Sequence, residues 1–383
     1  MASPLSFDRD LSQVLFEENQ GLRKVILNRP QQLNSLTLEM ISQMKRALEE
    51  YEVDDTIKLI ILKGQGKAFC AGGDVVRFVQ LVSEGHWSLA ARFYQKQLLL
   101  DYLIATYNKP LVVLMNGVVM GGGAGLSMNA SFRVVTENTV FAMPEASIGH
   151  FPDVGASYFL SRLSGHFGEY LGLTGAKISG SEMLKCGLAT HFVFSKDIKS
   201  LEAELSKTAH DDVSTIPSTL EKFIHKSNLE QDSAWTRLDI INKCFSKKSV
   251  EDILTSLETE VVRCGDKWMA NAINSMKRAS PTSLKICLKS IREGRSSTLE
   301  ECLRRDYIVS RHMVRRTFNN DFFEGSRAMF FDKDKRPQWN PSRLENVGDE
   351  FVKKFFSDVD NDDDWDCLAL PNRKIRKIKT SKL

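Results

Sequence analysis

The chain has 383 residues, of which 42% are hydrophobic and 26% charged, and its formal net charge is +3. This length fits one large or two modest domains, and the near-neutral balance argues against nucleic acid or another strongly charged partner. Seven cysteines without a C-x-x-C pair argue against a disulfide framework or a bound metal, and no apolar run reaches the length of a membrane span.

The N-terminal part of the chain alternates between strand-like and helix-like segments. Residues 1–12 form a lead without a clear pattern. Apolar spacing and turn residues then predict, in order, a hairpin (13–18 and 22–27), a helix (38–51), a strand (57–63), a long helix (87–106) and a buried strand (111–115). Thr37 stands at the N-cap position of the first helix. This alternation predicts an α/β layered domain.

Two glycine-rich segments each follow a predicted strand. The first is Lys67–Asp74, with Gly72 and Gly73, and the second is Met120–Gly125, with three consecutive glycines. A glycine turn between a strand and a helix leaves backbone N–H groups pointing outward, and the helix dipole adds a positive end. Such a turn suits a negatively charged oxygen.

Two kinds of anion site use a turn of this type. A phosphate loop needs Lys and then Ser or Thr after its last glycine, but Leu126 and Ser127 follow Gly125. The dinucleotide spacing G-x-G-x-x-G also fails, because Leu126 stands where the last glycine of a pattern begun at Gly121 belongs. An oxyanion hole needs a second N–H from elsewhere in the chain, which the first glycine segment can supply. The pair favours an oxyanion hole, although a tight turn is the commoner interpretation of one such segment alone.

The motifs together resemble the crotonase (enoyl-CoA hydratase/isomerase) superfamily, and most closely its 3-hydroxyisobutyryl-CoA hydrolase branch, the plant members in particular. The resemblance extends from about residue 14 to about residue 341. The matching segments are Asn28–Pro30, Leu33–Leu36, Ala68–Asp74, Met120–Gly125, Phe141–Glu145 and Phe151–Gly155. The pairing of Pro-Glu with Phe-Pro-Asp-Val-Gly is specific to the hydrolase branch.

The resemblance implies a ββα superhelix rather than a doubly wound sheet. From about residue 196 helical periodicity dominates, which indicates a second, helical region. The predicted organisation is a crotonase-like core with the oxyanion hole (13–205), a helical region covering the acyl-CoA site (206–345) and a charged tail (346–383).

The resemblance also assigns the catalytic groups. The backbone N–H groups of Gly73 and Gly122 match the family's oxyanion donors. Glu145 is the predicted carboxylate, either attacking the thioester or activating water, and the sequence does not decide between these two roles. By itself, a glutamate in a loop is more often a surface residue. Asp153 is predicted to contact the 3-hydroxyl group of the acyl chain, and it could equally cap the segment that begins near Gly155.

Further residues are expected to bind the substrate. They are Ala71, Asp74, Gln97, Met120 and Gly121, together with Gly122, Glu145 and Asp153.

Three positions depart from the hydrolase pattern. Gln97 replaces a substrate-side Glu, Asn129-Ala130 replaces His-Gly, and His150 replaces a small or apolar residue. For His150, a loop position away from the substrate and a role in the pocket are equally good interpretations. These departures affect the expected acyl group more than the reaction type.

The resemblance implies hydrolysis of a 3-hydroxyacyl-CoA thioester, with 3-hydroxyisobutyryl-CoA giving 3-hydroxyisobutyrate and CoA in valine catabolism. It implies no metal or redox cofactor, since coenzyme A enters as part of the substrate, and it leaves room for a homo-oligomer. One alternative is a hydratase or isomerase, which Gly125 disfavours because hydratases carry a second catalytic glutamate there. The other is a non-catalytic acyl-CoA-binding protein of the same fold.

The tail has an acidic run over 358–366 and a basic run over 373–379, both expected to be solvated and disordered. The chain ends in Ser381-Lys382-Leu383, the peroxisomal address. This ending predicts location in the peroxisome and an import receptor as a partner. A nuclear signal or nucleic-acid patch is the weaker interpretation of the basic run, because no aromatic residues are interleaved with it.

Overall fold

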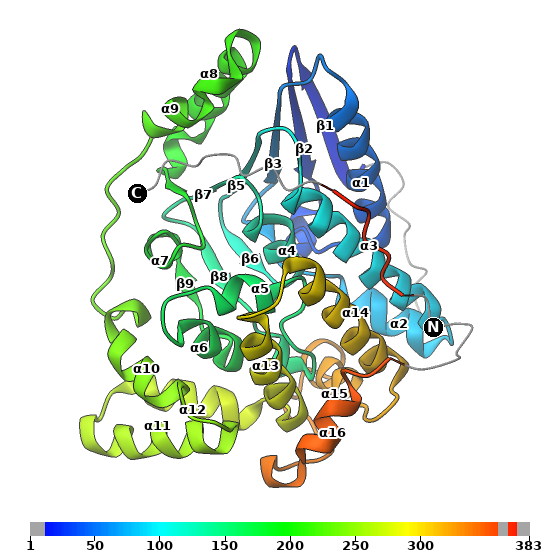
Figure 1. Ribbon diagram of the computed structural model, residues 1–383, viewed down its shortest axis with the longest axis vertical. Coiled ribbons are helices and arrows are strands. Elements are labelled where there is room, and N and C mark those ends of the chain that lie inside the picture. The colour runs from blue at the N-terminus through cyan, green and yellow to red at the C-terminus, as the bar shows by residue number, and fades with distance from the viewer. Residues whose placement is uncertain (1–11, 359–366, 374–383) are drawn as a thin grey trace, which may run out of the picture.

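Two β-sheets form the centre of the molecule (Figure 1), and the computed structural model describes residues 12–358 and 367–373. The larger sheet has the strand order β1-β2-β3-β5-β7-β10, and the smaller has the order β4-β6-β8-β9. The strands are β1 Val14–Asn19, β2 Leu22–Leu27, β3 Leu59–Gly64, β4 Ala68–Cys70, β5 Leu111–Met115, β6 Val118–Met120, β7 Phe132–Val135, β8 Val140–Ala142, β9 Ile178–Ser179 and β10 His191–Phe192.

A repeated unit of two strands and a helical segment builds both sheets. β3, β5 and β7 lie side by side in the larger sheet, and the strand that follows each of them, β4, β6 or β8, lies in the smaller one. The helical segments that complete the units are α2 (Val75–Ser83), α4 (Gly122–Met128) and the 3-10 turn η2 (Glu145–Ile148). The predicted ββα arrangement is therefore confirmed.

The short strands β4 and β6 correct one sequence-based expectation. The glycine segments were expected to follow the long strands 57–63 and 111–115 directly, but a three-residue strand lies between each long strand and the glycines. These short strands pair in parallel, with Ala68 opposite Val118. Because neighbouring parallel strands end at the same edge of a sheet, the two glycine segments emerge side by side.

The first hairpin and helix agree with the sequence analysis. β1 and β2 pair antiparallel, from Val14 opposite Leu27 to Asn19 opposite Leu22. Helix α1 (Leu38–Val53) begins after Thr37, whose hydroxyl accepts a hydrogen bond from the Met40 N–H at 3.2 Å. Its apolar face packs on the sheet because its apolar residues recur at helical spacing.

Successive residues of β3 face opposite sides of the larger sheet, as a strand requires. Ile60 and Leu62 belong to the core beneath α1 and α3 (Trp87–Ala105), whereas Leu59 and Ile61 pack against α8 (Ile198–Asp211) and α9 (Ile216–Glu221). Residue 205, the predicted end of the core domain, therefore falls inside α8. That helix belongs to the sheet's own core, so the change in composition near residue 196 does not mark a boundary.

The remaining helices surround the smaller sheet and extend away from it (Figure 1). Their bounds are α5 Ala156–Ser161, α6 Phe167–Thr174, α7 Gly180–Cys186, α10 Leu238–Phe245, α11 Val250–Cys264, α12 Lys267–Arg278, α13 Pro281–Gly294, α14 Leu299–Arg315 and α15 Asp321–Ser326. α14 packs on α3, and α13 packs on α5. A π-helical turn, η6 (Arg327–Phe331), continues α15. None of the helices within the described ranges is both long and apolar enough to cross a bilayer.

The C-terminal part differs from the disordered tail that was expected from residue 346. Helix α16 (Asp349–Lys354) lies within it, and Val347 and Phe355 are buried in one apolar cluster with Phe151. Further on, the Arg373 guanidinium donates to Thr106 Oγ1 at 2.8 Å and to the Glu52 carboxylate. Apolar residues interrupt the charged sequence and supply this packing. Most of both charged runs and the terminal Ser381-Lys382-Leu383 lie outside the described residues.

Candidate active site

The backbone N–H groups of Gly73 and Gly122, just beyond the ends of β4 and β6, lie close together. Gly72 (φ +106°) and Gly121 (φ +48°) directly precede these two residues and adopt backbone conformations that favour glycine. A Cβ built on Gly122 would lie 3.5 Å from the Gly73 backbone N. Neither Gly73 nor Gly122 donates its N–H to a backbone acceptor in the described chain. Two unused donors this close together fit an oxyanion hole, in which each donor contributes about 2.7–4 kcal/mol.

Glu145 lies directly beside these donors. It begins the turn η2 after Pro144, and a Cβ on Gly121 would lie 3.0 Å from its Oε1. The side chain is buried, and Oε2 has no hydrogen-bond partner among the described residues. Burial raises the pKa of Glu145 well above its usual value, and the negative charge of Asp153 adds to the effect. A carboxyl group in this state is suited to moving a proton near neutral pH.

Asp153 is held on the same side of the cavity by the loop between η2 and α5. Burial and the nearby Asp306 carboxyl raise the pKa of Asp153 well above its usual value. Asp306, on α14, accepts a hydrogen bond from the Gly155 N–H at 2.8 Å and thereby fixes this loop. Burial raises the pKa of Asp306 to about 7. The side chain of Asp153 does not have the capping role that the sequence allowed. Gly155 is the N-cap of α5, and no side chain caps that helix.

Gln97 and Asp101, one turn apart on α3, lie behind the oxyanion hole. Gln97 Nε2 donates to Asp101 Oδ1 at 2.8 Å, which leaves Gln97 Oε1 without a partner in the described residues and 3.6 Å from a Cβ built on Gly122. A Cβ on Gly125 would lie 2.5 Å from Asp101 Oδ2. Asp101 therefore occupies the space beside Gly125 that a side chain at position 125 would need.

Asp101 was missed by the sequence analysis. The sequence does contain a pattern that identifies Asp101 as unusual: it is the one charged residue in the apolar run Leu98–Ile104 of a predicted helix. Such a residue is buried and must be either protonated or paired. In the structure, burial raises the pKa of Asp101 well above its usual value, despite the hydrogen bond from Gln97.

His150 lines the cavity rather than an outer loop. Its Nδ1 lies 2.9 Å from the Phe151 carbonyl oxygen, which can only accept, so Nδ1 carries the proton. Nε2 then accepts from the Tyr94 hydroxyl at 3.2 Å, and the two rings are stacked with centroids 5.5 Å apart. Burial lowers the pKa of His150 to about 4, so the ring is neutral at neutral pH. Of the two interpretations of His150, the pocket position is the correct one.

All of the predicted site residues line a single cavity of about 460 Å³, which we call the glycine-lined cavity. They are Ala71, Gly73, Asp74, Gln97, Met120, Gly121, Gly122, Glu145 and Asp153. The carboxylate of Asp74 is engaged elsewhere, since it accepts from Arg29 at 3.0 Å and caps α2.

The sequence analysis missed the apolar wall of the glycine-lined cavity. This wall consists of Phe93 and Tyr94 on α3, Phe322 on α15, and Met329 and Phe330 on η6. Of the region expected to cover the site (206–345), only α15 and η6 contribute lining residues among those described. No described group of three or more His, Cys, Asp or Glu side chains is arranged to hold a metal ion.

Replacing Asp101 by asparagine is expected to stabilise the protein at alkaline pH. The unfolded chain ionises Asp near pH 3.9, while the folded protein keeps Asp101 protonated to a much higher pH. Between these two pKa values the folded state holds a proton that the unfolded state has lost, so stability falls as pH rises. Asparagine removes this penalty and can still accept from Gln97.

The measurement is the melting temperature of both proteins at pH 4 and pH 8. The variant should melt higher at pH 8, by about 1 °C for each kcal/mol of penalty removed in a chain of this size, and the difference should shrink at pH 4. The exposed Asp55→Asn serves as the control. An equal difference at both pH values would contradict the protonated state assigned to Asp101.

The fold and the site together are typical of proteins that process acyl-CoA thioesters: a ββα superhelix in which two unused N–H groups lie close together beside a buried carboxyl. The sequence model of the enoyl-CoA hydratase/isomerase family matches residues 22–356, and the chain belongs to this family. The Arabidopsis thaliana protein named probable 3-hydroxyisobutyryl-CoA hydrolase 3 is 50% identical over 94% of this chain and 96% of its own length. The human mitochondrial 3-hydroxyisobutyryl-CoA hydrolase is 39% identical over 94% of this chain and 92% of its own length.

Solved structures agree on the fold. A carnitinyl-CoA dehydratase from Mycobacterium thermoresistibile superposes with a TM-score of 0.83 at 32% identity, covering 92% of this chain and 98% of that one. The predicted location in the peroxisome is wrong, and the import receptor predicted with it has no support. Relatives from Arabidopsis thaliana, Danio rerio and Homo sapiens are named mitochondrial, which overturns an inference that rested on the last three residues alone.

Proposed function

We propose that this protein hydrolyses the thioester of 3-hydroxyisobutyryl-CoA, releasing 3-hydroxyisobutyrate and coenzyme A. One observation carries the proposal: the unused N–H groups of Gly73 and Gly122 lie close to the buried carboxyl of Glu145, whose Oε2 has no partner among the described residues, and position 125 carries no carboxylate. The names of relatives that match nearly the whole chain support this acyl group. The product belongs to the acids formed in valine breakdown.

In the proposed reaction the thioester oxygen lies between the Gly73 and Gly122 N–H groups, which stabilise the negative charge that grows on it. Glu145 either removes a proton from water as the water attacks the carbonyl carbon, or attacks that carbon itself and forms an anhydride that water then opens. In both routes the C–S bond breaks, and the departing thiolate of coenzyme A takes up a proton. Coenzyme A is part of the substrate, and neither route uses a metal or redox group.

Selection of the 3-hydroxyl group is assigned to Asp153 and Gln97. Gln97 Oε1 has no partner in the described protein and faces the oxyanion hole. An acceptor held in this way can bind a substrate hydroxyl, and a substrate without that hydroxyl leaves the acceptor unpaired, which costs affinity. Compared with the glutamate usual at this position in the family, Gln97 retains an oxygen that can accept a hydrogen bond but carries no negative charge. A homo-oligomer stays a prediction.

Thiol release from purified protein tests the proposal, with 3-hydroxyisobutyryl-CoA, 3-hydroxypropionyl-CoA and isobutyryl-CoA as substrates. Release should be faster from both hydroxy thioesters than from isobutyryl-CoA, by about tenfold or more in kcat/KM, which corresponds to one unmade hydrogen bond. Crotonyl-CoA separates the hydratase alternative: hydration of its double bond without thiol release from any substrate would exclude the hydrolase. Binding of coenzyme A with no turnover at all would favour a non-catalytic protein.

A further inference from the structure

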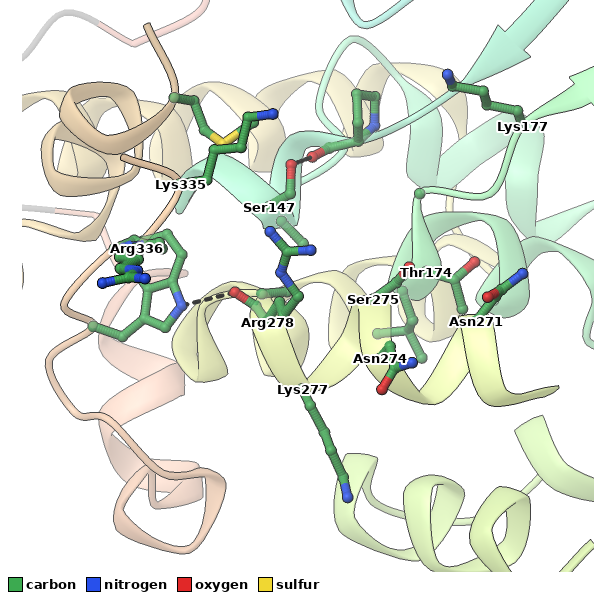
Figure 2. A pocket seen from close by; sticks show the side chains of 18 residues that line it. Ser147, Thr174, Lys177, Asn271, Asn274, Ser275, Lys277, Arg278, Lys335 and Arg336 are labelled. Carbon is green, nitrogen blue, oxygen red and sulfur yellow. Dashed lines mark hydrogen bonds between the residues drawn. The ribbon is translucent and has the colours of Figure 1, made fainter. Parts of the chain in front are cut away.

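A second cavity, larger than the first, adjoins the glycine-lined cavity. It has a volume of about 910 Å³ and lies between the end of α6, helix α12 and the loop that follows η6 (Figure 2). The two cavities share Pro144, Ser147 and Met329 as lining residues, so the turn that carries Glu145 forms part of the wall between them. We call this second space the basic cavity.

The charged residues that line the basic cavity are all positive. They are Lys177, Lys277, Arg278, Lys335 and Arg336, and no Asp or Glu is among the lining residues. Lys277 differs from the other four, because it pairs with Glu258 at 2.6 Å and points away from the other cations in Figure 2. The side chains of the other four form no ion pair with any residue in the described ranges. Figure 2 shows the Arg278 guanidinium directed toward Ser147.

The local secondary structure gives a reason for a cation at only one of these four positions. Arg278 lies in the last turn of α12, where the helix dipole favours a cation. Lys177 comes from the connection between α6 and β9, and Lys335 and Arg336 come from the loop after η6. Unpaired cations from three separate segments around one hollow repel each other, and a bound anion would remove that repulsion.

The other lining residues suit a phosphorylated organic ligand. Asn271, Asn274 and Thr174 offer hydrogen bonds, and Trp339 offers an aromatic ring. The indole orientation is fixed, because Nε1 donates to the Arg278 carbonyl oxygen at 3.0 Å. Lys and Arg bind phosphate oxygens strongly, and an aromatic ring can stack on a nucleobase.

We propose that the basic cavity binds the phosphate groups of a nucleotide through Lys177, Arg278, Lys335 and Arg336. This ligand chemistry has two sources. One is the nucleotide end of the acyl-CoA whose thioester occupies the glycine-lined cavity, a case that rests on the proposed function. The other is a free nucleotide that binds beside the site. The shared lining residues place the two cavities next to each other, as the first source requires.

The test compares wild type with the double variant Lys335→Gln/Arg336→Gln. Both residues are exposed, and their hydrogen bonds within the described chain use backbone atoms, so the change removes two charges and leaves those bonds in place. Lys277→Gln is the matched control, since it removes a cation of the same cavity wall that points away from the others. Binding of adenosine 3′,5′-bisphosphate is measured by calorimetry at low and high salt. Thiol release is measured with 3-hydroxyisobutyryl-CoA and with its N-acetylcysteamine thioester, which has no nucleotide.

The bisphosphate should bind wild type and Lys277→Gln, and should bind the double variant about tenfold or more weakly, with an affinity that falls as salt rises. If the nucleotide belongs to the substrate, the double variant also raises KM for the CoA thioester relative to the truncated thioester, and the bisphosphate competes with the CoA thioester. If the nucleotide is a free ligand, the binding loss occurs without either kinetic effect.

Equal bisphosphate affinity in wild type and the double variant, or an equal loss in Lys277→Gln, would overturn the proposal. Absence of thiol release from both thioesters would count against the proposed function instead. The calorimetric comparison would still decide whether the basic cavity binds nucleotide.

Discussion

Replacing Glu145 by glutamine is expected to lower kcat for thioester hydrolysis by about 10²–10⁴-fold, the usual contribution of a general base. Glutamine has nearly the same shape but can neither accept the proton of the attacking water nor form an anhydride. Glu145 Oε2 has no hydrogen-bond partner among the described residues, so the substitution breaks no hydrogen bond of that atom. The measurement is steady-state thiol release, with the melting temperature of both proteins recorded alongside.

The pH dependence of wild type gives a second check on Glu145. Its carboxyl must be ionised to act, and burial raises its pKa well above the usual value. Activity should therefore fall as pH drops through that raised pKa, well above the pH at which an ordinary glutamate is protonated. For the Glu145→Gln substitution itself, the matched control is Glu39→Gln, which changes an exposed glutamate on α1 and should keep full activity. Retention of wild-type kcat by Glu145→Gln would remove Glu145 from the chemistry.

Substitution of Gly122 by alanine is expected to lower kcat/KM by about 10²–10³-fold, the loss typical of one oxyanion-hole donor. The added Cβ would lie 3.5 Å from the Gly73 N and 3.6 Å from Gln97 Oε1, in the space that the thioester oxygen requires. The backbone tolerates the change, because Gly122 has no positive φ and begins α4. Its nearest neighbour would be Leu36 Cδ1 at 3.1 Å, the end of a flexible side chain.

Gly348→Ala is the control for Gly122→Ala, since a Cβ there meets no atom within 4 Å and its φ is −74°. Both variants should melt close to wild type, and only Gly122→Ala should lose activity. An active and stable Gly122→Ala protein would show that the thioester oxygen does not lie between the two glycine N–H groups.

The sequence predicted the polar part of the candidate site better than its apolar part. Gly73, Gly122, Glu145 and Asp153 each belong to a short motif, and the pairing of β4 with β6 brings the two glycine motifs together. Phe93 and Phe322 come from α3 and α15, whose positions depend on packing between segments far apart in the chain. No local pattern distinguishes an aromatic residue at a cavity from one in the core, so these residues could not be identified.

The same distinction applies to the fold. The hairpin, α1 and β5 follow from local spacing and capping, and they agree with the structure. β4 and β6 are three residues long, too short for an alternating pattern to indicate a strand. The segment after residue 346 appeared disordered because of its charge, but a few apolar residues such as Val347, Phe355 and Leu368 hold parts of it against the helices.

The close packing of Gly125 against Asp101 limits how this protein could acquire a second catalytic carboxylate at position 125, and with it a different reaction. A glutamate introduced at position 125 would collide with the Asp101 carboxyl, and a small residue introduced at 101 alone would leave Gln97 without its anchor and a void behind the oxyanion hole. Each single step is therefore expected to be harmful, although the pair together could be tolerated. The two positions form an epistatic pair, and adaptation or laboratory selection toward a site with a carboxylate at position 125 would have to change them together.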